Sequence, residues 1–313
     1  MSLARALELA AVAARAAYPK PTVGAVVVSD GEAVGEGVTE AGGRHAEVVA
    51  LDQAGPRARG ATLFVTLEPC AHHGTTPPCS ERVIAEGVAR VVVGSRDPNP
   101  EAAGGVEVMR AGGVEVELVD SFEARIQNEA WRVWVSQRRP FVTYKVATTL
   151  DGRTVVPGRR YISGEQSRRF VHELRAASDA VAVGMGTVRT DAPRLDARGV
   201  AVPRGQPRRL AFGRGPLPPD SPLELRSGPL REELDALGAE GVQSLLLEGG
   251  ATLAGAFLGE DLLDKILVFV APVLAFGDGP LLLPRLGSRR DLSHLGARLV
   301  GEDVLLEAYV HAP

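Results

Sequence analysis

The feature that most restricts the fold of this chain is a histidine followed, beyond a strand, by two cysteines. His45-Ala46-Glu47 is expected at the start of a helix, and Pro69-Cys70 follows an expected strand. Cys79 opens the next expected helix. One nitrogen and two sulfur ligands suit a catalytic zinc, which keeps its fourth position open. The motif therefore ties two helix N-termini and one strand end to a single site.

Glu47 is not needed as a ligand in this arrangement, so it is available as an acid/base. His45 and Cys79 are expected at helix N-termini, where exposed N–H groups stabilise negative charge and so help to keep the cysteines deprotonated. Zinc lowers the pKa of water toward ~7, so a nearby carboxylate can take its proton and later deliver it to a leaving amine. The order His-x-Glu, Pro-Cys, Cys is typical of zinc deaminases. The alternative is that the two cysteines are simply small buried apolar groups.

Composition narrows the class of protein. The chain has 313 residues, 45% of them apolar, with 2 Cys and a net charge of −4. These values exclude a disordered chain, a collagen-like chain and a disulfide scaffold. The charge provides no basic footprint for a nucleic acid or an anionic membrane. The segment Met1–Ala17 is interrupted by charges and has no clean apolar core region, so no secretory signal and a cytoplasmic location are expected.

Strand and helix signals alternate along the first half, which predicts an α/β sheet with helices on its faces. The expected helices are Leu3–Ala17, Arg44–Ala54, Ser80–Glu86 and Phe122–Gln137. The expected strands are Val23–Val28, Ala33–Val38, Ala61–Leu67, Ala89–Gly94 and Val114–Val119.

The second half has the same style without repeating the sequence. Its expected strands are Phe141–Thr148, Asp179–Gly184, Arg208–Phe212, Val242–Glu248, Lys265–Ala271 and Val304–Tyr309, and its expected helices are Gln166–Ala177 and Ala251–Leu258. The segment Pro203–Pro229 is rich in Pro, Gly and Arg and predicts a long loop or a weak element. Arg138-Arg139-Pro140 separates two expected domains, residues 1–139 and 140–313.

Eight residues separate the two cysteines, where the general deaminase pattern has two. The segment Thr66–Cys79, with Val23-Gly24 upstream and Asp97-Pro-Asn-Pro100 downstream, resembles the bifunctional deaminase/reductase family of riboflavin biosynthesis. The resemblance continues through the second half and so covers nearly the whole chain. Its landmarks there are Pro140-Phe-Val-Thr-Tyr-Lys145, Leu150-Asp-Gly-Arg153, Gly186-Thr-Val-Arg-Thr-Asp191 and Glu248-Gly-Gly250.

The resemblance implies an N-terminal cytidine-deaminase-like α/β/α sandwich and a C-terminal dihydrofolate-reductase-like α/β domain. It implies zinc and NADPH as cofactors and a phosphorylated pyrimidine as substrate. The first domain would deaminate 2,5-diamino-6-(5-phosphoribosylamino)pyrimidin-4-one hydrolytically. The second would reduce the ribosyl group to give 5-amino-6-(5-phosphoribitylamino)uracil. A homo-oligomer built through the reductase domains is also implied, with the apolar stretch Lys265–Gly277 as a contributor.

The resemblance also assigns roles to individual residues. In the first domain His45, Cys70 and Cys79 would hold zinc, Glu47 would move the proton and His72 would line the substrate site. In the second domain the residues that would line NADPH are Ala147, Tyr161, Thr187, Asp191 and Gly250, and those that would face the ribosyl phosphate are Lys145, Arg175, Leu195, Arg198 and Glu248. A helix start after Glu248-Gly-Gly250 suits a cofactor phosphate, whereas no Gly-x-Gly-x-x-Gly is present.

The chain departs from the family pattern at several positions. Lys20 stands where the family usually has Asn, Thr75 where it usually has Arg, and Tyr161 where it usually has Trp. The chain thus gains a cation at position 20 and lacks one at position 75. Lys20 could replace the missing arginine in binding phosphate, or the deaminase could be impaired. The loop from Asp151 to Tyr161 is short, which leaves the choice between NADPH and NADH open. Nine arginines between Arg153 and Arg198 indicate either a solvated surface or phosphate binding.

Two other functions compete with this interpretation. One is a zinc deaminase of another base, with a degenerate reductase domain. The other is a structural zinc protein whose second half is an assembly module. A free acid/base at Glu47 argues against the second, because a structural zinc site would use a fourth protein ligand.

Overall fold

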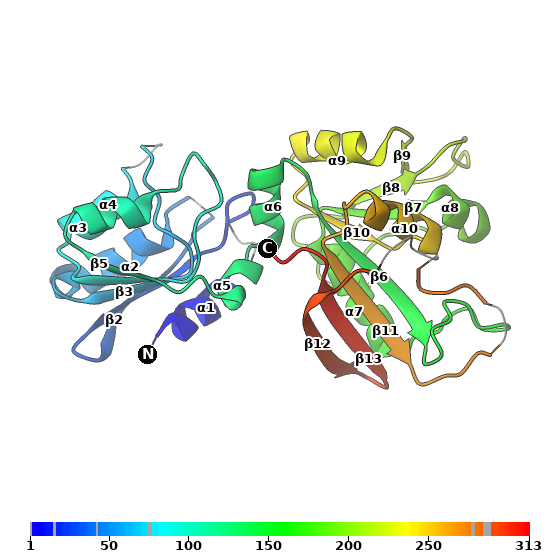
Figure 1. Ribbon diagram of the computed structural model, residues 1–313, viewed down its shortest axis with the longest axis horizontal. Helices are drawn as coiled ribbons and strands as arrows, with labels where there is room; N and C mark the ends of the chain where they lie inside the picture. Colours follow the sequence, from blue (N-terminus) through cyan, green and yellow to red (C-terminus); the bar gives the residue numbers. More distant parts are fainter. Residues whose placement is uncertain (1, 15–16, 42, 74–76, 277–278, 284–288) are drawn as a thin grey trace. The chain divides into compact units, whose positions relative to one another are not determined.

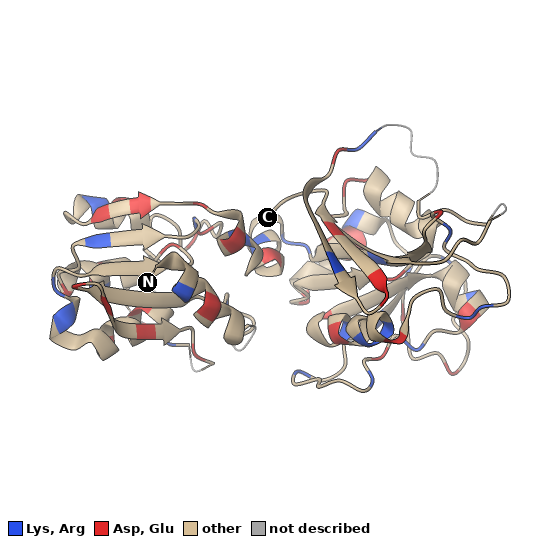
Figure 2. Cartoon of the chain, turned by 90° about the horizontal axis from the view of Figure 1, so that it is seen from below, with Lys and Arg blue, Asp and Glu red and all other residues tan. Residues whose placement is uncertain are grey.

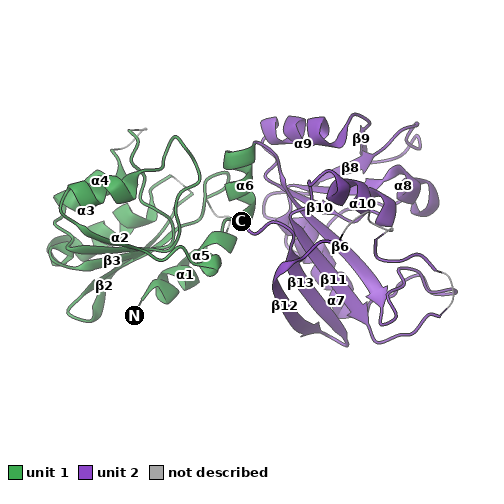
Figure 3. Cartoon of the chain, in the orientation of Figure 1, with its two compact units in different colours: residues 1–137, 313 green, residues 138–312 purple. Residues whose placement is uncertain are grey.

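The computed structural model describes residues 2–14, 17–41, 43–73, 77–276, 279–283 and 289–313. The chain forms two compact units, residues 1–137 with 313 and residues 138–312 (Figure 3). The boundary expected at 139/140 lies two residues beyond this division at 137/138. Each unit is a sheet covered by helices, which confirms the expected α/β class (Figure 1).

The sheet of the first unit has five strands in the order β2-β1-β3-β4-β5. Its strands are β1 (Gly24–Ser29), β2 (Glu32–Val38), β3 (Thr62–Val65), β4 (Arg90–Val93) and β5 (Glu115–Leu118). β1 pairs antiparallel with β2 and β3, while β3, β4 and β5 are parallel. The Asp30-Gly31 hairpin is therefore present as expected, with both residues at positive φ.

The helices of this unit cover both faces of the sheet (Figure 1). They are α1 (Leu3–Val12), α2 (Ala46–Ala54), α3 (Cys79–Ala85), α4 (Gly105–Ala111), α5 (Phe122–Ile126) and α6 (Glu129–Gln137), with a 3-10 turn at Gly55–Ala58. α2 lies very close to β2, because a Cβ built on Gly37 would lie 2.2 Å from the carbonyl oxygen of Ala46. This close approach fixes the N-terminal end of α2, where His45 and Glu47 lie.

Two helix expectations in this unit are wrong in extent, and one helix was not expected. α1 ends at Val12 rather than Ala17. The segment Phe122–Gln137 is two helices, and the break falls at Gln127-Asn128. There the side chain of Asn128 binds the backbone of Thr22 instead of facing solvent. α4 was not expected, since Gly104-Gly105 at its start resembles a loop.

The sheet of the second unit has eight strands in the order β12-β13-β11-β6-β10-β7-β8-β9. They are β6 (Phe141–Thr149), β7 (Ala180–Gly184), β8 (Arg208–Phe212), β9 (Glu224–Arg226), β10 (Ser244–Leu247), β11 (Lys265–Ala271), β12 (Ser293–Val300) and β13 (Asp303–Tyr309). The strands from β11 to β9 in this order are parallel, and β13 and β12 add antiparallel at one edge. The carboxyl ends of the parallel strands therefore meet at one edge of the sheet, where open α/β sheets bind ligands.

Helices again pack on both faces of this sheet. They are α7 (Glu165–Ala177), α8 (Met185–Asp191), α9 (Leu230–Ala239) and α10 (Ala251–Gly259). The side chains of α9 and α10 pack with Tyr144 on one face, and α7 packs with Phe269 on the other. Lys145 and Ala147 alternate with Tyr144 along β6 and so lie on the α7 face.

Four elements of the second unit were not expected: α8, α9, β9 and β12. β9 is a three-residue strand inside the segment Pro203–Pro229, in agreement with the weak element that its composition allows. Within the described residues, no helix is long and apolar enough to cross a membrane. Acidic and basic residues are interspersed along both units rather than separated by sign (Figure 2).

Candidate functional site

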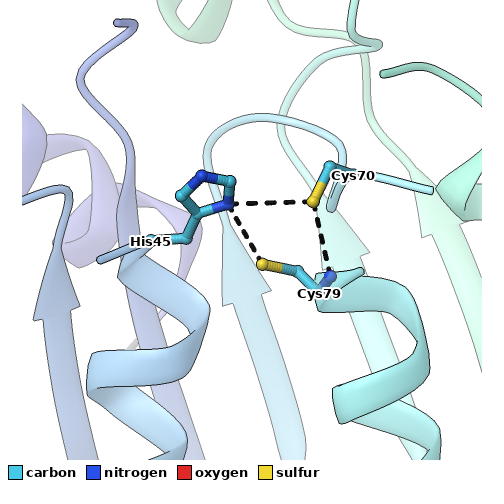
Figure 4. A group of neighbouring side chains, drawn as sticks. All are labelled: His45, Cys70 and Cys79. Atoms are coloured by element: carbon cyan, nitrogen blue, oxygen red, sulfur yellow. Dashed lines mark hydrogen bonds between the residues drawn. The ribbon is translucent and has the colours of Figure 1, made fainter. Parts of the chain in front are cut away.

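The structure brings His45, Cys70 and Cys79 together (Figure 4). His45 is the N-cap of α2, Cys79 is the first residue of α3, and Cys70 lies in the segment after β3. The Nδ1 atom of His45 is 3.2 Å from Sγ of Cys79 and 3.7 Å from Sγ of Cys70. The ligand atoms all lie within 4.8 Å of one another, which is compatible with a single ion between them.

The two thiols are unequal. The interaction between the Cys79 and Cys70 side chains, with others from His45 and the Cys79 backbone, lowers the pKa of Cys70 well below its ordinary value. The same interaction, with burial and the charge of Glu47, raises the pKa of the Cys79 thiol. A cation bound between the two sulfurs favours the thiolate form of both cysteines. Free thiols, a histidine nitrogen and this spacing fit zinc.

Glu47 lies in the first turn of α2 and is 4% exposed. Burial raises the pKa of its carboxyl to about 7, although the charge of His45 acts in the opposite direction. A carboxyl that titrates near neutral pH can both accept and return a proton. The three ligand atoms do not include the carboxylate of Glu47.

A cavity of about 320 Å³ opens beside the ligands. Its lining includes His45, Glu47 and Cys70. The other residues around it are Pro19, Lys20, Pro21, Val23, Thr39, Gly43, Leu67, Glu68, His72, Asp97, Asn99, Ala102, Trp131, Trp134 and Val135. His72 and Lys20 are both part of the wall. Thr75 lies outside the described residues.

A second group of polar side chains lies on the α7 face of the other unit. Arg175 of α7 binds Glu248 with both arms of its guanidinium, at 2.6 and 2.9 Å. Lys145 Nζ is 3.9 Å from the Glu248 carboxylate. Burial lowers the pKa of Lys145, against the charge of Glu248. Burial acts to raise the pKa of Glu248, but Arg175 and Lys145 outweigh it and the pKa lies below its ordinary value.

The segment from Leu195 to Arg198 joins this group through its backbone. The carbonyl oxygen of Asp196 accepts a hydrogen bond from Arg175 at 3.1 Å and lies 3.2 Å from Nδ1 of His172. Leu195 is buried beneath, while the side chain of Arg198 is exposed. Sequence reasoning missed His172 and Asp196. The signal for His172 was available, because it lies three residues before Arg175 on α7 and so shares its helix face.

The residues expected to line NADPH are spread over three elements and a loop. Ala147 follows Lys145 on the same face of β6, Gly250 is the N-cap of α10, and Thr187 and Asp191 are in α8. Tyr161 lies in the loop before α7 and is 53% exposed, and its ring contacts the guanidinium groups of Arg160 and Arg168. A Cβ on Gly250 would meet nothing within 4 Å, so the backbone at the start of α10 is open to a cofactor phosphate.

Together, fold and site define a class of protein: a zinc-dependent deaminase domain followed by an α/β reductase domain. The first part of the chain, residues 2–95, matches the cytidine and deoxycytidylate deaminase zinc-binding region. Residues 140–306 match the RibD C-terminal domain. The chain belongs to the RibD family of riboflavin biosynthesis proteins.

Similar proteins span nearly the full length. The chain is 39% identical to riboflavin biosynthesis protein RibD of Aquifex aeolicus, with 92% of each chain covered. A solved structure of Acinetobacter baumannii RibD superposes with a TM-score of 0.83 at 34% identity, covering 98% of this chain and 97% of that one. A Thermotoga maritima structure, described as a diaminohydroxyphosphoribosylaminopyrimidine deaminase/5-amino-6-(5-phosphoribosylamino)uracil reductase, has a TM-score of 0.81 at 32% identity, with 98% and 97% covered. These likenesses confirm the expected family, and with it a zinc-binding deaminase domain and an NADPH-dependent reductase domain.

Proposed function

We propose that the first unit deaminates 2,5-diamino-6-(5-phosphoribosylamino)pyrimidin-4-one and that the second reduces the product's ribosyl group with NADPH. The final product is 5-amino-6-(5-phosphoribitylamino)uracil. The observation that carries the proposal is the buried carboxyl of Glu47 in the same cavity as His45 and Cys70. It supplies the proton-transfer group that a zinc site lacks when it is only structural.

In the deamination, His45, Cys70 and Cys79 hold zinc and Glu47 moves the proton. Zinc held there supplies Lewis-acid chemistry and lowers the pKa of water toward ~7. Glu47 accepts a proton from the attacking water and returns it to the amino group that leaves as ammonia. Its burial keeps the carboxyl titrating near neutral pH, so both transfers are possible in one turnover. His72, on the cavity wall, contacts the pyrimidine substrate.

In the reduction, the second unit acts mainly by positioning, because the hydride belongs to the cofactor. Ala147, Tyr161, Thr187, Asp191 and Gly250 lie along NADPH. The residues that face the phosphoribosyl group are Lys145, Arg175, Leu195, Arg198 and Glu248. The ion pairs among Lys145, Arg175 and Glu248 hold these side chains in place before the substrate arrives.

The test separates the two activities. Glu47→Gln keeps the shape of the side chain but removes the proton shuttle, so deamination falls by about 10²- to 10⁴-fold. Zinc content and NADPH-dependent reduction of pre-deaminated substrate stay at the level of the unaltered chain. Ammonia release and NADPH absorbance are followed separately. Loss of both activities with zinc retained contradicts the division of roles, and reduction absent from the unaltered chain favours a deaminase with a degenerate second domain.

The finer proposal for assembly is a homodimer formed through β12. All but the last of its residues are exposed, and Leu295 and Leu299 are 74% and 73% exposed. β12 is the edge strand of the sheet, and an antiparallel pair of two such edges has twofold symmetry. In the stretch Lys265–Gly277, β11 is already paired on both sides and Gly277 lies outside the described residues. Light scattering on Leu295→Glu, expected to be monomeric, tests this.

The proposed place of action is the cytoplasm. Cys70 and Cys79 are free and buried, and a reducing compartment keeps such thiols available for zinc. Fractionation of cells that express the full chain checks this expectation.

A further inference from the structure

The zinc cavity has an uneven distribution of charge. Lys20 is the only Lys or Arg among its described lining residues, whereas the carboxyl groups of Glu47, Glu68 and Asp97 lie along its walls. Glu68 is 3% exposed and accepts hydrogen bonds from the backbone N–H groups of Asp97, Gly104 and Val106. An anionic group of a ligand is therefore disfavoured near these carboxyl groups and attracted at Lys20.

Lys20 lies at the mouth of the cavity. Its side chain is exposed, and its Nζ atom lies 3.2 Å from the position that a Cβ on Gly43 would occupy. Gly43 itself lines the cavity and has a φ of 91°, so the turn that leads to His45 requires glycine. The Lys20 ammonium therefore lies next to the Gly43 turn, which leads to the metal ligand His45.

The backbone around Lys20 is held firmly, which distinguishes this lysine from an ordinary surface one. Pro19 and Pro21 flank it, and its N–H donates to the carbonyl oxygen of Ala17 at 3.0 Å. Thr22 follows Pro21, and both its backbone N–H and its backbone carbonyl bind the side chain of Asn128. Oδ1 of Asn128 accepts from the Thr22 N–H and Nδ2 donates to the Thr22 carbonyl, each at 2.9 Å.

Asn128 is 8% exposed and lies at the break between α5 and α6. Its side-chain amide both accepts from and donates to the backbone of Thr22, as a neighbouring strand would. It therefore fixes the position of the chain directly after Pro21. α6 also provides Trp131 and Trp134 to the cavity wall. The same break therefore orients an aromatic wall and the segment that carries Lys20.

We propose that Lys20 binds the phosphate group of the deaminase substrate and that Asn128 positions the segment that carries it. The proposal rests on the proposed function and names the residue of this chain that selects a phosphorylated substrate. A phosphate monoester carries about −1.5 to −2 charges at pH 7, and three acidic residues belong to the cavity lining. The uncharged pyrimidine enters toward zinc and Glu47, and the phosphate stays at the mouth. His72 is another exposed residue of the cavity lining and can add a hydrogen bond to the phosphate.

The experiment compares two substrates in the zinc-loaded full chain. One is the phosphoribosyl pyrimidine, and the other is the same molecule after removal of its phosphate. For Lys20→Gln, KM for the phosphorylated substrate rises roughly five- to tenfold at low salt while kcat stays within about twofold. KM for the dephosphorylated substrate is unchanged. Lys20→Arg restores most of the affinity, because a guanidinium also pairs with phosphate.

Arg90→Gln is the matched control. It removes one positive charge from the same unit, but Arg90 of β4 is paired with Glu115 and Glu117 of β5. Arg90 does not line the cavity. Its KM for both substrates equals that of the unaltered chain. Added salt raises KM for the phosphorylated substrate in the unaltered chain and much less in Lys20→Gln, because screening removes the same attraction.

Asn128→Ala tests the positioning role. The ratio of the two KM values shifts in the direction seen for Lys20→Gln, with zinc content retained. Simple destabilisation would leave that ratio unchanged, and such a result rejects the role of Asn128. Equal losses on both substrates in Lys20→Gln overturn the phosphate assignment. Failure of the unaltered chain to deaminate either pyrimidine counts against the proposed function instead.

Discussion

Asp97 illustrates how one buried group sets a pH dependence. Burial raises the pKa of its carboxyl to about 6, the Asn99 backbone N–H opposes this shift, and the charge of Glu68 adds to it. In the unfolded chain the pKa is about 3.9. The folded state therefore keeps a proton that the unfolded state has released, and stability falls as pH rises between these two values. Above pH 6 the ionised, buried carboxylate remains a constant penalty.

Asp97→Asn removes this penalty and keeps the acceptor for the Asn99 N–H, which lies 2.8 Å from Oδ1. We expect Asp97→Asn to raise the free energy of unfolding. The increase is about 1 kcal/mol larger at pH 7.5 than at pH 5. Urea unfolding followed by tryptophan fluorescence measures it, because both tryptophans of the chain, Trp131 and Trp134, lie in the first unit. Asp30→Asn, on an exposed turn, is the control. A gain that is larger at pH 5 contradicts the expectation.

Single residues differ in how far the sequence reveals their role. The spacing of His45, Cys70 and Cys79 indicates one site because helix starts and a strand end can be located from local signals. The buried setting that raises the pKa of Glu47 has no local signal, since it depends on packing from distant parts of the unit. The same is true of Asn128, whose partner is 106 residues away.

At the scale of elements, α4 shows why some helices escape a sequence pattern. Its N-terminus is stabilised by Glu68, which accepts from the N–H groups of Gly104 and Val106. The capping residue is therefore 36 and 38 residues away in the chain, not beside the helix. Gly105 lets α4 come close, because a Cβ there would lie 1.7 Å from the Pro69 carbonyl oxygen. The glycines that resemble a loop are what allows the helix to dock beside Cys70.

α7 is fastened to the sheet by Arg175, and this contact supports a prediction. Arg175→Gln leaves Glu248 with only Lys145 as a charged partner at 3.9 Å among the described residues. Because the side chain of Glu248 is 9% exposed, its only partly compensated charge lowers the free energy of unfolding of the second unit by about 2 kcal/mol. Circular dichroism in urea measures this, with tryptophan fluorescence as the readout of the other unit.

Arg169→Gln is the matched control for Arg175→Gln. It lies on the same helix, but its side chain is 74% exposed and pairs only with Glu173 within the described residues. Its loss changes the free energy of unfolding by less than about 0.5 kcal/mol. Equal effects of the two variants would show that the Arg175–Glu248 pair does not fasten α7.

At the scale of the whole molecule, each unit contains its own core and its own site. The zinc ligands come from α2, α3 and the segment after β3, whereas Lys145, Arg175 and Glu248 come from β6, α7 and the end of β10. At the start of the second unit, Arg139 and Asp264 form a buried bidentate pair with two contacts of 2.7 Å. Asp264 also accepts from the N–H of Val142 at the start of β6, so the first strand of this unit is anchored within the unit.

Removal of zinc should therefore affect the two activities unequally. A chelator leaves His45, Cys70 and Cys79 without the ion that links α2 to α3, so deamination is lost and the first unit unfolds at lower urea. Reduction of pre-deaminated substrate by NADPH continues, since every group assigned to it belongs to the second unit. Tryptophan fluorescence reports the first unit and NADPH absorbance the second. Added zinc restores deamination, and a parallel loss of reduction on chelation would show that the two units do not act independently.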